Sequence, residues 1–159
     1  MPALVAACQD PEIARWTRVP SPYGEADARL YLQQRHDALH AAATAPFAVV
    51  DAAEDRRLLG SISLMRFVWE HGRAEAGYWL AREARGMGHA VRAVRLISRW
   101  GFETLGLERI ELLTATANAA SQRVAERAGF SREALLRSYF AHDRRRYDMI
   151  AYGLLAEEI

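Results

Sequence analysis

The sequence predicts an α/β fold in one domain, residues 1–159. Three observations support this prediction. The run Glu75–Ala81 alternates its side chains between two faces, as a strand does. The stretch Ala90–Leu105 repeats apolar side chains at helical spacing, opposite a polar face. A chain of 159 residues, 51% of them hydrophobic, is also long enough to bury a core and too apolar to be disordered.

The first third of the chain predicts two helices followed by two strands. Proline and glycine mark the breaks between periodic segments. The expected helices are Pro2–Trp16 and Glu25–Ala42, separated by Thr17–Pro22. The expected strands are Phe47–Val50 and Leu58–Phe67, separated by the charged turn Asp51–Arg56.

The remainder predicts a strand, a long helix, another strand, a shorter helix and a final antiparallel pair. The turn Glu70–Arg73 leads into the strand Glu75–Ala81, and the long helix Ala90–Leu105 is followed by the strand Arg109–Thr114. Asn118 is a good N-cap for the shorter helix, and Gly129 lies just past its end. The final strands are expected at Phe130–Leu136 and Tyr147–Leu154, on either side of the basic turn His142–Arg146.

A glycine-containing turn, Arg85-Gly-Met-Gly-His-Ala90, connects the strand Glu75–Ala81 to the long helix. The first backbone N–H groups of a helix lack partners within it and lie at the positive end of its dipole, so such a turn can bind phosphate. Gly86 and Gly88 would let an anion approach the backbone closely, and Arg85 would add a positive charge beside it. The turn therefore indicates a cofactor that contains a pyrophosphate.

Other interpretations of this turn are weaker, and one remains open. A dinucleotide site needs a third glycine, but that position is Val91, and Glu108 and Glu111 do not lie at the end of the next strand. A P-loop needs a lysine, which this chain lacks altogether. A turn with two glycines before a helix is also, about as often, only a turn.

Three segments together resemble the GCN5-related N-acetyltransferases, and within them the branch similar to the ribosomal-protein N-acetyltransferases RimJ and RimL. These segments are Glu75-Ala-Gly-Tyr-Trp-Leu80, Arg85-Gly-Met-Gly-His-Ala90, and Asn118-Ala-Ala-Ser121 with Ala128-Gly-Phe130. The match runs in order from about Asp10 to the C-terminus. The resemblance implies a mixed, mostly antiparallel sheet, flanked by helices and splayed where the cofactor enters. It also implies acetyl-CoA as donor, an amine as acceptor and direct transfer without a covalent enzyme intermediate.

The resemblance also assigns roles to individual residues. The pyrophosphate loop of the family matches Arg85, Gly86, Met87, Gly88, His89 and Ala90, and Trp79 and Leu80 match the strand end that pairs with the pantetheine arm. Asn118 matches an asparagine that contacts the cofactor. Glu75 matches an acidic residue proposed to accept the proton of the amine, and Ser121 a serine proposed to protonate the leaving thiolate.

The proposed chemistry suits these residue types, but plainer interpretations stay open. An α-amino group has a pKa near 8, so a carboxylate within reach helps it lose a proton before it attacks. Glu75 could instead be a solvated strand residue, and Ser121 an ordinary first-turn residue of its helix. Tyr139 is an alternative proton donor. A catalytically silent CoA-binding or regulatory domain, or a nucleotide-binding scaffold without CoA, would share the fold.

Composition narrows the classes of partner. A net charge of +1 and one short basic turn argue against nucleic acid. Cys8 is the only cysteine, which excludes an intrachain disulfide, and its position suggests a packed thiol. Neither a long apolar window nor a basic leader is present, so a soluble, cytoplasmic protein away from membranes is expected. The histidines suggest no metal site, and the acceptor could be a peptide N-terminus or a small-molecule amine.

The N-terminus departs from the family pattern. Family members usually begin with a strand, whereas Met1–Asp10 already has the pattern of the first helix. The sheet is therefore expected to be one strand short, which would leave Phe47–Val50 as an edge with unpaired backbone groups. A loop or a second subunit, as in a homodimer, could cover that edge.

Overall fold

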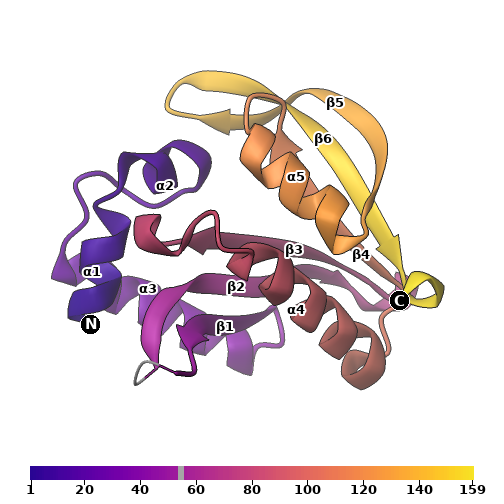
Figure 1. The fold of residues 1–159 in the computed structure, drawn as a ribbon, viewed down its shortest axis with the longest axis horizontal. Helices are drawn as coiled ribbons and strands as arrows, with labels where there is room; N and C mark the ends of the chain where they lie inside the picture. Colours follow the sequence, from indigo (N-terminus) through magenta and orange to yellow (C-terminus); the bar gives the residue numbers. More distant parts are fainter. Residues whose placement is uncertain (54–55) are drawn as a thin grey trace. The chain divides into compact units, whose positions relative to one another are not determined.

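A computed structural model describes residues 1–53 and 56–159 of the protein (Figure 1). Residues 54 and 55 of the predicted turn Asp51–Arg56 lie outside the described residues. The chain groups into two compact units. Unit 1 comprises Met1–Ser63 and Tyr78–Ala90, and unit 2 comprises Leu64–Gly77 and Val91–Ile159. The single domain expected from the sequence remains a prediction.

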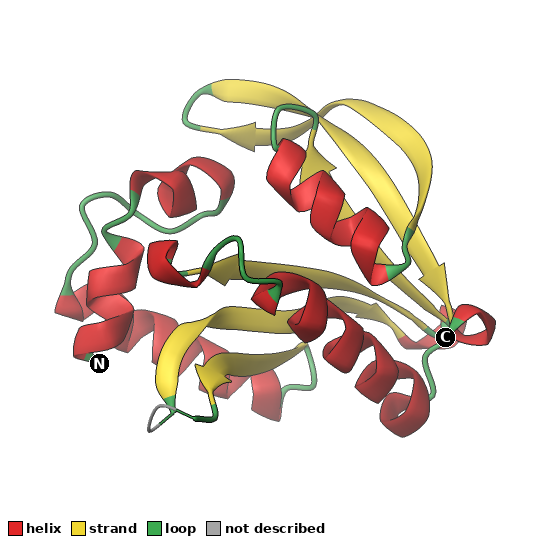
Figure 2. Ribbon diagram, viewed as in Figure 1, coloured by secondary structure: helices red, strands yellow, loops and turns green. Residues whose placement is uncertain are grey.

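Within the described residues, six strands form one sheet in the order β1-β2-β3-β4-β6-β5 (Figure 2). They are β1 (Thr44–Asp51), β2 (Arg57–Val68), β3 (Arg73–Leu80), β4 (Arg109–Ala115), β5 (Ser131–His142) and β6 (Arg145–Leu155). β3 and β4 are parallel, whereas β4 with β6 and β5 with β6 are antiparallel. The predicted fold class, a mixed and mostly antiparallel sheet flanked by helices, is confirmed.

The N-terminal segment of unit 1 forms two short helices where the sequence analysis expected one. They are α1 (Pro2–Cys8) and α2 (Pro11–Trp16). The prediction of a continuous helix over Pro2–Trp16 is wrong because Pro11 has no N–H to donate and disfavours a helical residue before it. Asp10 instead caps α2 by accepting a hydrogen bond from the backbone N–H of Glu12 at 3.0 Å.

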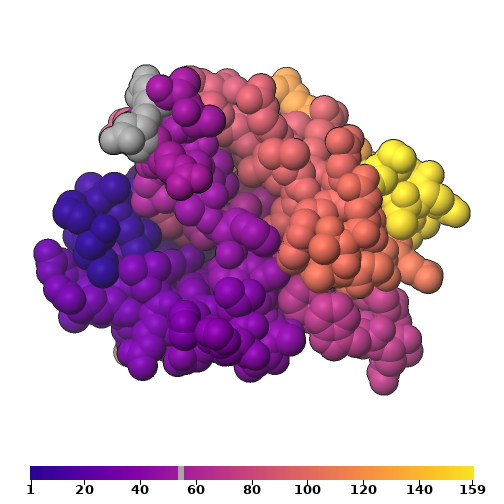
Figure 3. All heavy atoms as spheres, turned by 90° about the horizontal axis from the view of Figure 1, so that it is seen from below, coloured from indigo at the N-terminus to yellow at the C-terminus, as the bar shows by residue number. Residues whose placement is uncertain are grey.

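Helix α3 (Glu25–His40) completes the helical part of unit 1. It contacts α1 and β1, and in Figure 3 the indigo residues of α1 lie against the purple surface of α3. Side chains from these helices enclose a small core, which consists of Leu4, Cys8, Ile13, Tyr23, Ala28 and Trp79. Burial there raises the pKa of the Cys8 thiol to about 11, which suits a packed thiol and not a nucleophile.

Trp79 belongs to this core. Trp79 and Leu80, neighbours at the end of β3, are both buried, so both faces of the strand are covered there. Gly60 on β2 makes their position possible. A Cβ atom added there would lie 2.2 Å from the carbonyl oxygen of Trp79. Any side chain at Gly60 would therefore push β2 away from the end of β3.

The core of unit 2 lies where helix α4 (His89–Leu105) packs against the sheet. Val94 and Ile97 of α4 are buried, as the helical spacing predicts. Gly101 allows the close approach, because an added Cβ atom would lie 2.9 Å from Leu64 and 3.0 Å from Ile110. Met87, which the sequence analysis assigned to the pyrophosphate loop, precedes the helix and is 63% exposed.

Helix α5 (Ala119–Ala128) contacts β4 and β5 within unit 2 (Figure 1). β5 and β6 form a longer hairpin than the strands Phe130–Leu136 and Tyr147–Leu154 suggested, because both strands continue almost to the turn at Asp143 and Arg144. A register shift between Leu136 and Phe140 accompanies a positive φ of 53° at Ser138. This bulge bends β5 before Tyr139.

β1 lies at one end of the strand order, as expected for Phe47–Val50. Within the described residues, the segment before Asp10 is helical and contributes no strand to the sheet. Phe47 and Val50 are exposed large apolar residues on this edge strand. Its coverage by a loop or a second subunit stays a prediction.

Candidate functional site

The turn Arg85–Ala90 lies in unit 1, between the short 3-10 helix Arg82–Ala84 and α4. Gly86 and Gly88 both have φ of +80°, a region that residues with a Cβ atom rarely adopt. An added Cβ atom would meet nothing within 4 Å at either glycine. Backbone conformation, and not crowding, therefore requires glycine here, and the space beside the backbone is open to a ligand.

The Arg85 guanidinium is already bound to other groups of the protein. Its Nε and Nη2 atoms donate to the backbone carbonyl of Leu80 at 3.2 and 2.9 Å. Nη2 also forms an ion pair with Oδ2 of Asp10 at 2.7 Å. Arg85 thus ties the turn to the end of β3 and to the start of α2, and its direct contact with a phosphate stays a prediction.

The strand end formed by Trp79 and Leu80 is held firmly within unit 1. The Leu80 carbonyl accepts from Arg85, and the next residue, Ala81, donates its N–H to the carbonyl of Leu59 at 2.8 Å. The predicted pairing of Trp79 and Leu80 with a pantetheine arm would therefore use an ordered backbone, part of whose hydrogen-bonding capacity is already occupied.

Glu75 lies on β3 within unit 2, and its side chain is 17% exposed. Its Oε2 atom accepts a hydrogen bond of 2.8 Å from Nη1 of Arg66 on β2. Burial raises the pKa of the Glu75 carboxyl group, the Arg66 guanidinium opposes that rise, and Glu111 adds to it. Glu75 is thus neither fully solvated nor without a counterion.

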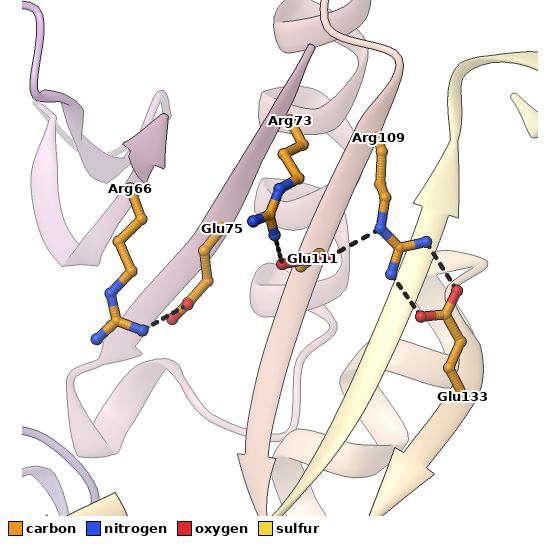
Figure 4. Close-up of polar contacts among 6 residues, drawn as sticks. All are labelled: Arg66, Arg73, Glu75, Arg109, Glu111 and Glu133. Atoms are coloured by element: carbon orange, nitrogen blue, oxygen red, sulfur yellow. Dashed lines mark hydrogen bonds and ion pairs between the residues drawn. The ribbon is translucent and has the colours of Figure 1, made fainter. Parts of the chain in front are cut away.

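The Arg66–Glu75 pair is part of a row of charged residues across the sheet (Figure 4). Glu111 on β4 binds Arg73 at 3.2 Å and Arg109 at 3.0 Å. Arg109 also binds both carboxylate oxygens of Glu133 on β5, which lowers the pKa of Glu133. Gly153 on β6 leaves room for this contact, since its added Cβ atom would lie 2.3 Å from Glu133.

Asn118 and Ser121 meet at the start of α5, also within unit 2. Oδ1 of Asn118 accepts a hydrogen bond of 3.1 Å from the backbone N–H of Ser121, so Asn118 is the N-cap that the sequence predicts. Ser121 is half-buried in the first turn of the helix. The contact of Asn118 with a cofactor and the proton donation by Ser121 remain predictions.

The alternative proton donor, Tyr139, lies beyond the bulge of β5 and is 52% exposed.

The histidines add one observation that sequence spacing did not suggest. His36 and His40, four residues apart on α3, place their Nε2 atoms 3.0 Å from one another. No group of three or more metal-ligating side chains occurs among residues 1–53 and 56–159. No helix in that part of the chain is long and apolar enough to span a membrane.

Comparison with known proteins connects the two groups of residues to one family. Residues 1–131 match the family described as an acetyltransferase (GNAT) domain. The chain belongs to the GNAT family. The match covers the turn Arg85–Ala90, Glu75, Asn118 and Ser121, and it confirms the family that the sequence motifs predicted.

Bacterial GNAT proteins of known sequence support the same assignment. YdaF of Bacillus subtilis (strain 168), provisionally named a ribosomal N-acetyltransferase, is 36% identical over 65% of this chain and 57% of its own length. The uncharacterized N-acetyltransferase YoaA of the same strain is matched over 60% of its length. The uncharacterized N-acetyltransferase p20 of Bacillus licheniformis is 30% identical over 94% of this chain and 83% of its own length. The chain thus spans somewhat over half the length of the first two relatives and most of the third.

Solved GNAT structures share the fold. A Vibrio cholerae protein, provisionally named a ribosomal-protein-serine acetyltransferase, has a TM-score of 0.84 at 23% identity, over 97% of this chain and 87% of its own. The Vibrio cholerae spermidine N-acetyltransferase in complex with CoA and spermine has a TM-score of 0.81 at 24% identity, over 98% of this chain and 89% of its own.

Sequence reasoning missed two residues that hold the predicted site residues. Arg66 binds Glu75 from a different strand, and no motif marks such a contact. Asp10 binds Arg85, and the pair Asp10-Pro11 signals only that Asp10 is the N-cap of α2, not this second contact. The residues of the predicted site are thus held in two groups, one in each unit.

Proposed function

We propose that the protein transfers the acetyl group of acetyl-CoA to a primary amine. The observation that carries this proposal is the open turn at Gly86 and Gly88, both at φ +80°, immediately before α4 in a chain of the GNAT family. The backbone N–H groups of Gly86 to Ala90 would bind the pyrophosphate of the cofactor. A proposed cytoplasmic location fits an enzyme that uses this cofactor.

In the proposed reaction, Glu75 accepts a proton from the ammonium form of the acceptor, directly or through water. The free amine then attacks the thioester carbon and forms a C–N bond. The nitrogen of the tetrahedral intermediate loses a second proton to solvent, and the intermediate breaks its C–S bond to give the amide and CoA as the thiolate. Ser121, Tyr139 or solvent returns a proton to the sulfur. A half-buried carboxylate with a raised pKa is a better proton acceptor than an exposed one, provided that it stays ionised.

The names of two structurally similar proteins, a ribosomal-protein-serine acetyltransferase and a spermidine N-acetyltransferase, suggest two acceptor classes. We propose that the acceptor belongs to one of them, either the α-amine of a peptide or the amine of a small molecule. The acceptor is best identified by an assay of free CoA thiol released from acetyl-CoA. The panel contains N-terminal peptides beginning with serine, alanine and methionine, together with spermidine, spermine and simple amino acids.

The expected result is release of CoA that depends on one class of amine, with a product one acetyl group heavier in mass spectrometry. Binding of acetyl-CoA without turnover of any amine would favour a catalytically silent CoA-binding domain. Equal binding of CoA and ADP would favour a nucleotide scaffold and contradict the proposal.

A further inference from the structure

Glu75 and Glu111 occupy matching positions on the parallel strands β3 and β4. Residues in register on adjacent strands extend from the same face of a sheet, and both side chains appear on one face in Figure 4. Two carboxylates placed side by side repel one another, and this repulsion favours protonation of one of them. Each carboxylate therefore needs a cation nearby if both are to remain ionised.

The two carboxylates receive different numbers of cations. Glu111 binds Arg73 and Arg109. Among the residues that the structure describes, Glu75 has one ion-pair partner, Arg66, at 2.8 Å. Glu75 is thus the carboxylate whose ionisation depends on a single side chain.

Arg66 occupies an unusual backbone conformation. Its φ is +54°, in the left-handed region, within the strand β2. A residue with a Cβ atom pays a conformational cost there, and such a conformation persists only where the surrounding structure imposes it. From this position the Arg66 guanidinium reaches Glu75 on the neighbouring strand β3, while the Arg66 side chain remains 55% exposed.

We propose that Arg66 is a positioning residue that orients Oε2 of Glu75 and keeps this carboxylate ionised at neutral pH, so that Oε1 can accept the proton of the amine. The inference rests on the proposed role of Glu75 as the general base. The amine then binds next to a carboxylate whose negative charge Arg66 already partly balances.

The direction of the expected pH effect follows from the groups that face Glu75. Burial and Glu111 raise the pKa of Glu75, and Arg66 lowers it, while Arg73 faces Glu111. Removal of the Arg66 charge therefore raises the pKa of Glu75 further. A general base acts in its ionised form, so the acidic limb of the kcat/KM profile should move to higher pH.

The test compares Arg66→Met, which removes the charge, with Arg66→Lys, which keeps it. Arg99→Met, on the exposed face of α4, controls for the loss of one positive charge. The titration of Glu75 is followed by ¹³C NMR of its carboxyl carbon in the protein without substrates, and Glu75→Gln identifies the signal. The pH profile of kcat/KM is then measured with the amine found by the CoA-release assay.

In Arg66→Met we expect the Glu75 midpoint and the acidic limb to rise together by about one pH unit, the lower end of the effect of an adjacent opposite charge. Below the limb this shift reduces kcat/KM about tenfold, and the rate recovers at high pH. Arg66→Lys should restore most of the difference, and Arg99→Met should show none. If Arg66→Met does not fold, Arg66→Gln removes the same charge and is tested in its place.

Two outcomes would overturn the proposal, and they differ in what they imply. An unchanged NMR midpoint in a folded Arg66→Met shows that Arg66 does not control the ionisation of Glu75, whatever the activity. A shifted midpoint with an unmoved acidic limb shows that Glu75 is not the base. In that case the proposed role of Glu75 fails, while the electrostatic coupling is real.

Discussion

The turn Arg85–Ala90 and the charged row around Glu75 are built in opposite ways. The turn consists of consecutive residues, and its shape depends on two glycines with positive φ. The row consists of side chains from β2, β3, β4 and β5, whose hydrogen-bonded members are as far as 38 residues apart in the chain. The turn is proposed to bind an anion through its backbone N–H groups, whereas Arg66 in the row is proposed to control the charge of Glu75. A local motif therefore predicts the cofactor site, and long-range contacts set the environment of the proposed base.

The same contrast explains what the sequence could predict. Glycines, caps and periodicity act within a few residues, so α4, α5 with its N-cap Asn118, and the turn at Gly86 and Gly88 were all predicted. The partner of Glu75 could not be predicted, because strand register decides which arginine reaches it. The direction of the Arg85 side chain depends on Asp10, 75 residues earlier in the chain. The break at Pro11 could have been predicted from the Asp-Pro pair alone.

The largest expected effect comes from breaking the turn. Gly88→Asp places a negative charge, and a Cβ atom at φ +80°, where the pyrophosphate is proposed to bind. Acetyl-CoA should raise the melting temperature of the wild-type protein, because a ligand that binds the native state stabilises it, and Gly88→Asp should abolish that rise. Differential scanning fluorimetry with and without acetyl-CoA measures both.

Gly106→Asp is a matched control, because Gly106 also has a positive φ, of 67°, and open space around its Cβ position. It introduces the same charge and the same kind of strain after α4, away from the turn in sequence. A normal response to acetyl-CoA is expected. An unchanged response in Gly88→Asp as well would show that the turn does not bind the cofactor.

The second prediction removes the carboxylate of the row. Glu75→Gln should reduce kcat/KM by about 10²-fold at neutral pH, the scale of a lost general base. The melting-temperature response to acetyl-CoA should persist, because Glu75 is proposed to act on the amine and lies outside the proposed pyrophosphate site. Glu111→Gln is the comparison, since it changes the other carboxylate in register and should cost far less activity. Full activity in Glu75→Gln would make Glu75 an ordinary strand residue.

The third prediction distinguishes two roles for Arg85. It either binds the phosphate directly or holds the turn in shape through its contacts with Asp10 and Leu80. Asp10→Asn keeps an N-cap for α2 but removes the charge that binds Arg85. If the tether holds the turn in shape, Asp10→Asn and Arg85→Gln should both weaken acetyl-CoA binding about fivefold, or about 1 kcal/mol, the scale of one hydrogen bond. Isothermal titration calorimetry at two salt concentrations measures the loss. A loss confined to Arg85→Gln that shrinks at high salt would indicate direct contact with phosphate instead.

The smallest effect is expected at the proton donor. The CoA thiolate leaves readily, because a thiol loses its proton at a pKa near 8.5 and needs little help from an acid at neutral pH. Ser121→Ala should therefore reduce kcat by about threefold, below the usual range for general acid catalysis. Tyr139→Phe, at an exposed position beyond the β5 bulge, should act no more strongly. Steady-state kinetics of both variants and of their combination decides between them. A loss of 10²-fold or more in Ser121→Ala, with an unchanged melting temperature, would mean that protonation of sulfur limits the reaction. The start of α5 would then matter to catalysis as much as the charged row is proposed to.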